Sequence, residues 1–391
     1  MEPSVANRHS VQFTGDGASY FAIWIVNLVL TILTVGIYSP WAKVRRLRFF
    51  YGKTLVDGSP FEFHGSPIAI LKGRIVSLLL IIAYTQSAKI SVSLWFAVAA
   101  LLVAAAPWLF WKSLRFRLLN SSYRGVRFGF NGSLMQAYTT LALPILLFLA
   151  PAVVGYLAPT QPQQVPRPAL IGVLGSLTLL TICLLPWFYL RVKRYQHGHA
   201  QFGTSQFSFS GTIAGAYGLA FMILGIGILA AITGLIAGTA SGYVLGLLAH
   251  ASDLLALTPS VADTATSARA DKVIAITGGV LVGYLVLLSA YPLTSALAQN
   301  FVWSCTTLGS GRFASNVDAL TLWRIQFVNV LLLVLTLGLY WPYAVVRTTR
   351  YRLSRIDWTG DPAAIAARPP DAPVGATGEE AMEMFGFDLA L

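Results

Sequence analysis

Eight stretches of this sequence are apolar over the length of a membrane-spanning helix, which takes about 20 residues. They cover approximately residues 20–41, 68–88, 91–111, 138–158, 169–190, 213–248, 273–296 and 322–344. Only 11% of the 391 residues are charged and 56% are hydrophobic, whereas soluble domains carry about 25% charged residues. No soluble fold could bury that much apolar surface. The sequence therefore predicts an all-α polytopic membrane protein.

Basic residues, which give the chain a net charge of +12, gather at the ends of the apolar segments. Thirteen of the 27 lie in loops at about 43–53, 112–127 and 191–194. Loops rich in Lys and Arg normally face the cytoplasm. We therefore expect a multi-pass protein of the inner membrane with cytoplasmic basic loops. The expected partners are membrane lipids, and nucleic acid is not expected. Whether the chain forms a homo-oligomer is left open.

The first and last apolar segments resemble each other residue by residue. Residues 26–41 align with 328–343 without a gap, so that Asn27 corresponds to Asn329 and Gly36 to Gly338. Fainter copies lie between them, each with a proline at the end of an apolar segment and an arginine eight residues later. Self-similarity of this kind is typical of repeat-built proteins. The sequence predicts a repeated unit in which a helix ends at a proline and a basic turn follows.

Each unit continues with the pattern Phe-x-Phe-x-Gly, as in Phe61 to Gly65 and Phe128 to Gly132. Residues 54–63 alternate around an Asp-Gly pair, which is a hairpin signal. We therefore expect short β-hairpins on the basic side, joined as a small sheet or ring. Residues 11–13 could pair with 355–358 and complete the set. The alternative is that these aromatic residues only anchor the chain at the membrane interface.

Residues 1–358 are expected to form a single membrane domain. Its repeat units would be about 11–60, 61–127, 128–206, 207–312 and 313–358. The segment 359–391 is rich in Ala, Pro and Gly and carries acidic residues. A segment of this composition is expected to be a disordered C-terminal tail.

The charge pattern leaves two topologies open. If all eight segments span, the basic residues from Arg347 onward fall on the opposite side from the other basic loops. If segments 20–41 and 322–344 are instead re-entrant or broken hairpins, six spans remain and all basic loops share one side. Each of these two segments carries Asn, Thr and Gly near its middle. Non-helical backbone is tolerated at membrane depth where protein or water shields it.

The run from Asn27 to Arg45 contains the signature Leu-Thr-x-Gly-x-Tyr-x-Pro-Trp, from Leu33 to Trp41. Together with the Phe61-x-Phe-x-Gly65 pattern, it resembles the YjgN family. The resemblance covers nearly the whole chain up to about Trp358. This family consists of bacterial multi-pass inner-membrane proteins of unknown function. The resemblance therefore implies a membrane location and implies little about mechanism.

The sequence shows no set of residues that suggests catalysis. No carboxylate falls inside an apolar segment, and no Walker or HExxH motif is present. His197 and His199 are separated by one residue, but basic neighbours oppose a metal ion there. We therefore expect no enzyme activity, no metal and no cofactor.

Two sets of residues remain as candidate sites. Intramembrane amides, hydroxyls and glycines could line a substrate path at the interface of two similar halves: Asn27, Thr31, Thr34, Gly36, Asn329, Thr336 and Gly338. The alternative role for them is hydrogen bonding between helices. Aromatic and basic residues could meet lipid headgroups at the interface: Trp41, Arg45, Arg48, Arg115, Arg194, Arg347 and Arg350.

These sets support two hypotheses about function. The first is a channel or transporter for a small polar or lipid-like solute. The second is a non-transporting scaffold or lipid-binding protein with a basic, aromatic cytoplasmic face.

Overall fold

The computed structural model describes residues 8–157, 167–255, 264–361, 376 and 379–380. The chain forms two compact units. The first contains residues up to Tyr217, Phe301–Asn316 and the chain from Leu339 onward. The second contains Gly218–Asn300 and Val317–Gly338.

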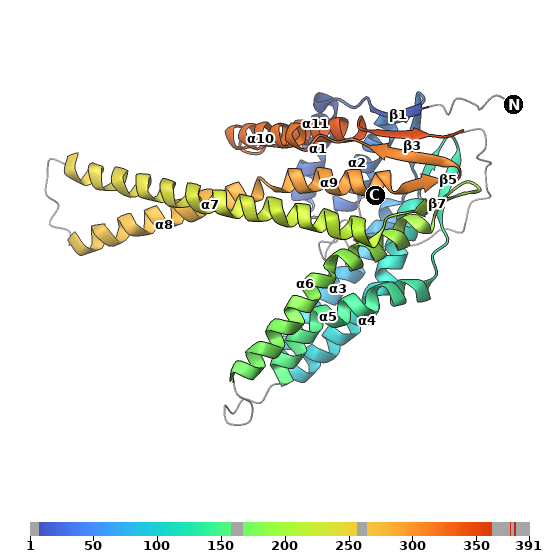
Figure 1. Cartoon of the computed structure of the whole chain (residues 1–391). Coiled ribbons are helices and arrows are strands. Elements are labelled where there is room, and N and C mark those ends of the chain that lie inside the picture. Colours follow the sequence, from blue (N-terminus) through green and yellow to red (C-terminus); the bar gives the residue numbers. More distant parts are fainter. Residues whose placement is uncertain (1–7, 158–166, 256–263, 362–375, 377–378, 381–391) are drawn as a thin grey trace. The chain divides into compact units, whose positions relative to one another are not determined.

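Among the residues that the structure describes, six stretches of helix are long and apolar enough to cross a membrane. They are α3 (Pro67–Ile90), α4 (Val92–Leu119), α5 (Leu134–Leu157), α6 (Arg167–Gly198), α7 (Ile213–Leu255) and the pair α8 (Thr264–Leu288) with α9 (Tyr291–Ser304). In the first unit α4 packs against α3 and α5, and α5 packs against α6 (Figure 1). The prediction of a polytopic membrane protein agrees with these six helices.

The first and last apolar segments are each broken by a turn. Helix α1 (Gly17–Leu33) is followed by α2 (Ser39–Lys53), and α10 (Ala319–Leu335) by α11 (Trp341–Leu353). Both α1 and α10 have 17 residues and fall short of the six longer stretches. The break within residues 20–41 and 322–344 is thus present, as the re-entrant alternative required.

The Thr-x-Gly sequence forms the turn after α1. The Thr34 hydroxyl donates to Leu30 O at 2.7 Å and accepts from the amide of Tyr38 at 2.9 Å. Gly36 has a φ of +89° and donates its N–H to Thr31 O, as in a helix-terminating Schellman turn. The turn after α10 is built alike by Thr336 and by Gly338, whose φ is +94°.

The predicted role of the prolines was wrong. Pro40 begins α2 instead of ending the preceding helix, and this first-turn position suits a residue without an N–H. Pro107 and Pro186 lie inside α4 and α6, which continue for twelve residues beyond each of them. Neighbouring helices can compensate for the missing backbone hydrogen bond.

Ten short strands in the first unit close into one antiparallel barrel. They are β1 (Arg8–Phe13), β2 (Thr54–Val56), β3 (Ser59–Phe63), β4 (Ser121–Tyr123), β5 (Val126–Phe130), β6 (Ala200–Phe202), β7 (Ser205–Phe209), β8 (Thr306–Leu308), β9 (Gly311–Ser315) and β10 (Ile356–Thr359). Their order around the ring is β1-β10-β9-β8-β7-β6-β5-β4-β3-β2. The fold class "all-α" was therefore wrong, although most of the chain is helical.

The predicted hairpins are confirmed, and strands from the two ends of the chain do close the ring. The predicted pairing of residues 11–13 with 355–358 was wrong in its register, because residues 8–10 pair with β10 and residues 11–13 pair with β2. Asp57 and Gly58 both have positive φ, as do Arg124 and Gly125, which is the backbone that two-residue hairpins prefer. Strand β1 pairs with β10, with His9 opposite Trp358, and also pairs with β2. Each hairpin directly follows one helix and precedes the next. That this order reflects a duplicated unit stays a prediction.

In the second unit α7 packs closely on α8 along glycines. A Cβ added at Gly234, Gly238 or Gly242 would lie 2.6–2.8 Å from backbone oxygens of α8. Small residues let the backbones of membrane helices approach in this way.

The predicted disordered tail falls mainly outside the described residues and stays a prediction there. Three of its residues that are described, Ala376, Glu379 and Glu380, are buried.

Candidate functional site

A cavity of about 340 Å³ lies within the barrel, and every one of the ten strands contributes to its wall. Its lining is dominated by apolar and aromatic side chains, namely Val11, Val56, Phe61, Tyr123, Val126, Phe128, Phe202, Phe207, Leu308, Phe313, Ile356 and Trp358, with Trp303 from α9. Pockets for small molecules typically measure about 300–1,000 Å³. The cavity is therefore large enough for part of a small ligand.

The two phenylalanines of each Phe-x-Phe pattern have different roles. They are two residues apart on a strand and therefore point to the same face. Phe61 lines the cavity, whereas Phe63 is 6% exposed and packs with Val44, Ile70 and Phe116. Likewise, Phe128 lines the cavity and Phe130 packs between α4 and α6. The second phenylalanine thus fixes the barrel to the helices, and the first is left to face the cavity.

The cavity-facing rings form a connected series around the wall. The ring centroids of Phe61 and Phe128 are 6.2 Å apart, those of Phe128 and Phe207 6.5 Å, and those of Phe207 and Phe313 6.0 Å. Trp358 continues the series at 6.5 Å from Phe313 and 5.3 Å from the imidazole of His9. This wall presents aromatic rings and aliphatic side chains to a ligand.

The few polar groups of the cavity mostly bind one another. His9 Nδ1 lies 2.7 Å from Asp57 Oδ2, and His9 Nε2 lies 3.3 Å from Gly360 O. The Tyr123 hydroxyl donates to Val56 O at 2.7 Å. Burial raises the pKa of Tyr123 above its ordinary value, against an opposing effect of the positive charge on Arg124. The phenol therefore stays neutral at physiological pH and its donor is already used.

The predicted path residues are distributed over both units. Asn27, Thr31, Thr34 and Gly36 belong to the first unit, and Asn329, Thr336 and Gly338 to the second. Asn27 is 8% exposed and its Nδ2 donates to Ala42 O at 3.4 Å. The threonine and glycine residues form the turns that end α1 and α10. These contacts give the set a structural role, and a transport role for it stays a prediction.

The predicted headgroup residues fall into two groups. Arg45, Arg48 and Arg347 are exposed, and Trp41 is half-buried and stacks on Tyr38. The other three arginines have local partners: Arg115 lies over the ring of Trp111, Arg194 donates to Gly211 O at 3.1 Å, and Arg350 donates to Gly15 O at 2.6 Å. Arg194 and Arg350 therefore tie strand ends to helices, Arg115 stacks within its own helix α4, and headgroup binding stays a prediction for both groups.

The cavity itself was not predicted as a site. The Phe-x-Phe pattern marks several of its phenylalanines in the sequence, but no local pattern connects His9, Tyr123, Phe202 and Trp358. Only ring closure brings them to one wall, because they lie on β1, β4, β6 and β10. Within the described ranges, no group of three His, Cys, Asp or Glu side chains is placed to hold a metal ion.

A profile of bacterial proteins of unknown function, DUF898, matches residues 8–384 of this chain. The chain belongs to the DUF898 family. The inner membrane protein YjgN of Salmonella typhimurium is 35% identical over 156 residues, and YjgN of Escherichia coli K12 is 32% identical over 181 residues. These matches span 39% and 44%, respectively, of both this chain and the relative. No solved structure matches.

The resemblance to the YjgN family is thereby confirmed. The DUF898 match runs from β1 through the described residues of the tail. The relatives are named inner membrane proteins, and the six membrane-length helices agree with a membrane location for this DUF898 protein.

Proposed function

We propose that this DUF898 protein is a lipid-binding protein of the inner membrane that takes up the apolar part of an amphiphile in its barrel cavity. The observation that carries the proposal is a closed ring of ten strands around a cavity lined with aromatic side chains. Small closed barrels commonly hold one ligand in this way.

The chemistry of the wall favours an apolar ligand. Burying one methylene group there would contribute about 0.8 kcal/mol. The polar groups at the wall have few hydrogen bonds left for a polar solute, because His9 is paired with Asp57 and the Tyr123 hydroxyl with Val56 O. A ligand rich in hydroxyls or charges would lose its hydration without finding partners.

The connections of the barrel favour a ligand that comes from the membrane. Strand β5 ends at Phe130 and α5, a helix of membrane length, begins at Leu134. Exposed arginines such as Arg45 and Arg48 lie on α2, which leads into β2. Basic side chains next to a membrane attract anionic headgroups. The proposed partners are therefore membrane lipids, whose headgroups would meet the basic residues of the protein on the cytoplasmic side. Neither enzyme activity nor a cofactor is part of the proposal.

The test places a tryptophan in the cavity and compares its effect on ligand binding with that of a tryptophan placed outside the cavity. Val126→Trp adds a large side chain to the cavity wall on β5, and Ala314→Trp adds it at an exposed position on β9. The full chain, purified in detergent, would be incubated with a fatty acid that carries a photoreactive diazirine on its chain. We expect crosslinks to peptides containing Phe128 and Phe207 in the wild type and in Ala314→Trp.

The same experiment contradicts the proposal if the crosslinks lie elsewhere or if Val126→Trp leaves them unchanged. A drop of about tenfold or more is expected for Val126→Trp, corresponding to about 1.4 kcal/mol of binding free energy. Thermal unfolding of both variants shows whether the loss comes from a filled cavity or from an unfolded barrel. In the second case, the position of the crosslinks in the wild type alone decides.

Transport is a second candidate function, and one observation favours it. Asn27 Oδ1 is buried and accepts no hydrogen bond from the described residues. A buried carbonyl oxygen without a donor is uncommon and suits a passing polar group. Asn27→Leu should then abolish solute flux in vesicles without lowering the folded yield, whereas a lower folded yield would indicate a role in packing.

A further inference from the structure

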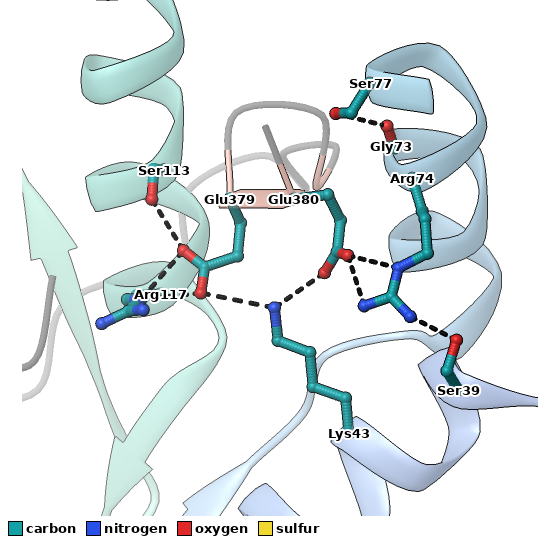
Figure 2. Close-up of polar contacts among 9 residues, drawn as sticks. All are labelled: Ser39, Lys43, Gly73, Arg74, Ser77, Ser113, Arg117, Glu379 and Glu380. Carbon is teal, nitrogen blue, oxygen red and sulfur yellow. Dashed lines mark hydrogen bonds and ion pairs between the residues drawn. The ribbon is translucent and has the colours of Figure 1, made fainter. Parts of the chain in front are cut away.

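Two glutamates near the end of the chain lie among three basic residues of the first unit (Figure 2). Lys43 of α2 lies 2.7 Å from Glu380 Oε1 and 3.6 Å from Glu379 Oε1. Arg74 of α3 lies 2.8 Å from Glu380 Oε2, and Arg117 of α4 lies 2.8 Å from Glu379 Oε1. Three different helices thus supply the cations, and one short segment supplies both anions.

Hydroxyl groups complete this cluster. Ser113 donates to Glu379 Oε2 at 2.7 Å, and a guanidinium N–H of Arg74 donates to Ser39. We call Lys43, Arg74, Arg117, Ser39 and Ser113 the basic site. The two carboxylates occupy it side by side, with Lys43 between them (Figure 2).

The two carboxylates and Lys43 are removed from water, whereas Arg74 and Arg117 remain partly exposed. Glu380 is 0% exposed, Glu379 is 4% exposed and Lys43 is 8% exposed. Charged groups at this depth are strongly unfavourable unless they are paired. If the carboxylates left, Lys43 would lose two anions while two arginines remained beside it. An anion in this place therefore stabilises the packing of α2, α3 and α4.

The glutamate segment is anchored by a small apolar contact. Ala376 is 1% exposed and lies in the cluster formed by Val44, Phe63, Ile70 and Phe116. Phe63 is the residue that fixes β3 to the helices beneath the cavity. The segment that carries the glutamates thus also contacts the residues that hold β3 against the helices.

The basic site and the two glutamates that lie in it come from different kinds of segment. The cations are held by packed helices, whereas the glutamates follow a stretch rich in Ala, Pro and Gly. Only one alanine side chain among the described tail residues adds apolar contact. The two carboxylates can therefore be exchanged for a mobile anion of similar charge, because the three cations of the basic site remain to bind that anion.

We propose that the basic site binds the phosphate of a phosphomonoester or diphosphate group, and that Glu379 and Glu380 occupy it as an internal competitor. Arginine and lysine bind phosphate oxygens through charge-assisted hydrogen bonds, and two neighbouring serine hydroxyls can add to them. The inference rests on the proposed lipid-binding function, because that function makes a lipid headgroup the source of the phosphate. Free phosphate compounds share the same chemistry, and the experiment separates the two sources.

The test measures binding to the purified full chain in detergent by calorimetry. The probes are dioctanoyl phosphatidate, dioctanoyl phosphatidylcholine and inorganic pyrophosphate. Removing the competitor in the double variant Glu379→Gln/Glu380→Gln should raise the affinity for phosphatidate by about tenfold or more. A matched variant, Glu62→Gln, removes a carboxylate that is exposed on β3 and should leave the affinity unchanged. Adding Lys43→Met and Arg117→Met to the double variant should abolish the gain.

A gain for phosphatidate without one for pyrophosphate supports the site with a lipid as its source. A gain for both supports the site with phosphate itself as the recognised group. Equal affinities of wild type and double variant, or a gain that survives Lys43→Met and Arg117→Met, overturn the proposal. A gain for phosphatidylcholine of the same size also overturns it, because that headgroup carries a compensating positive charge.

A second variant serves if the double variant does not fold. Ala376→Trp removes the apolar anchor and leaves all charges in place, so it should also raise the affinity for phosphatidate. Pyrophosphate has no acyl chain and does not need the barrel cavity. Its binding therefore tests the basic site separately from the proposed function, which the diazirine crosslinks at Phe128 and Phe207 test without the basic site.

Discussion

The ring of Phe63 lies directly against Gly65, so that a Cβ at residue 65 would be 2.5 Å from Phe63 Cε1 and Cζ. The same contact recurs between Phe130 and Gly132 and between Phe209 and Gly211, with corresponding distances of 2.5 and 2.4 Å. The glycine of the Phe-x-Phe-x-Gly pattern is therefore required by packing. It lets the chain turn from the strand into the next helix around a buried ring.

Gly65→Ala should destabilise the protein by about 1–3 kcal/mol, the usual cost of overpacking. The ring of Phe63 has little freedom to move, because it packs with Val44, Ile70 and Phe116. Gly52→Ala on α2 is the control, since a Cβ there meets nothing within 4 Å and alanine favours helix. Denaturation of the purified protein in detergent compares them, and equal stabilities would show that the ring shifts freely.

Gly238→Ala should weaken the contact between α7 and α8. The added Cβ would lie 2.6 Å from Gly279 O, which is backbone and cannot rotate away. Gly225→Ala on the same helix meets nothing within 4 Å and serves as the control. Both changes gain the same helix propensity, so the difference between them isolates the contact. Amide exchange of α8 should accelerate in Gly238→Ala only; acceleration in both would assign the effect to the helix itself.

The barrel was predictable because its turns carry a local signal. Asp57 and Gly58 suit a turn with two positive φ values, and alternation places Phe61 and Phe63 on one face. The sequence pattern nevertheless indicates an all-α class, because strands of three to six residues give little periodicity beside helices of 24 residues or more.

Neither the cavity nor the basic site could be predicted from the sequence. Which of the alternating residues face the cavity depends on the closure between β1 and β10, a pairing of residues as far apart as Arg8 and Thr359. The contact between Lys43 and Glu380 joins residues 337 positions apart. No local pattern marks Glu380 as a buried residue, because a segment of its composition is normally left in water.

Tyr123→Phe should change how stability depends on alkaline pH. Burial raises the pKa of Tyr123 above 10.0 in the folded state, so its contribution is complete below pH 10.0 and is lost as the pH rises through the folded-state pKa. At neutral pH the variant should lose about 0.5–1.5 kcal/mol with the hydrogen bond to Val56 O. The difference between wild type and variant should shrink above pH 10.0. A difference that is independent of pH would contradict the burial effect.

The turn after α1 should lie within the membrane without crossing it. Val35 is 92% exposed and Leu33 is 72% exposed, so this end of the α1–α2 hairpin presents bare apolar side chains. Such surface is stable only in contact with lipid or another apolar partner. A single cysteine at Val35, in a chain with Cys183 and Cys305 replaced, tests this placement. The residue has a φ of +50°, which a side chain without β-branching tolerates at least as well as valine.

Val35→Cys should react with a membrane-impermeant maleimide from neither side of intact membranes and should react after detergent is added. Arg46→Cys, an exposed position on α2, should react in inside-out vesicles and remain protected in intact cells. If Val35→Cys reacts in intact cells, α1 crosses the membrane and the placement of this turn within the membrane is wrong. Protection from both sides instead leaves six spans, because the chain then returns through α2 to the side from which α1 entered. Only that count places the basic residues of α2 and of α11 on one side, as the positive-inside rule requires.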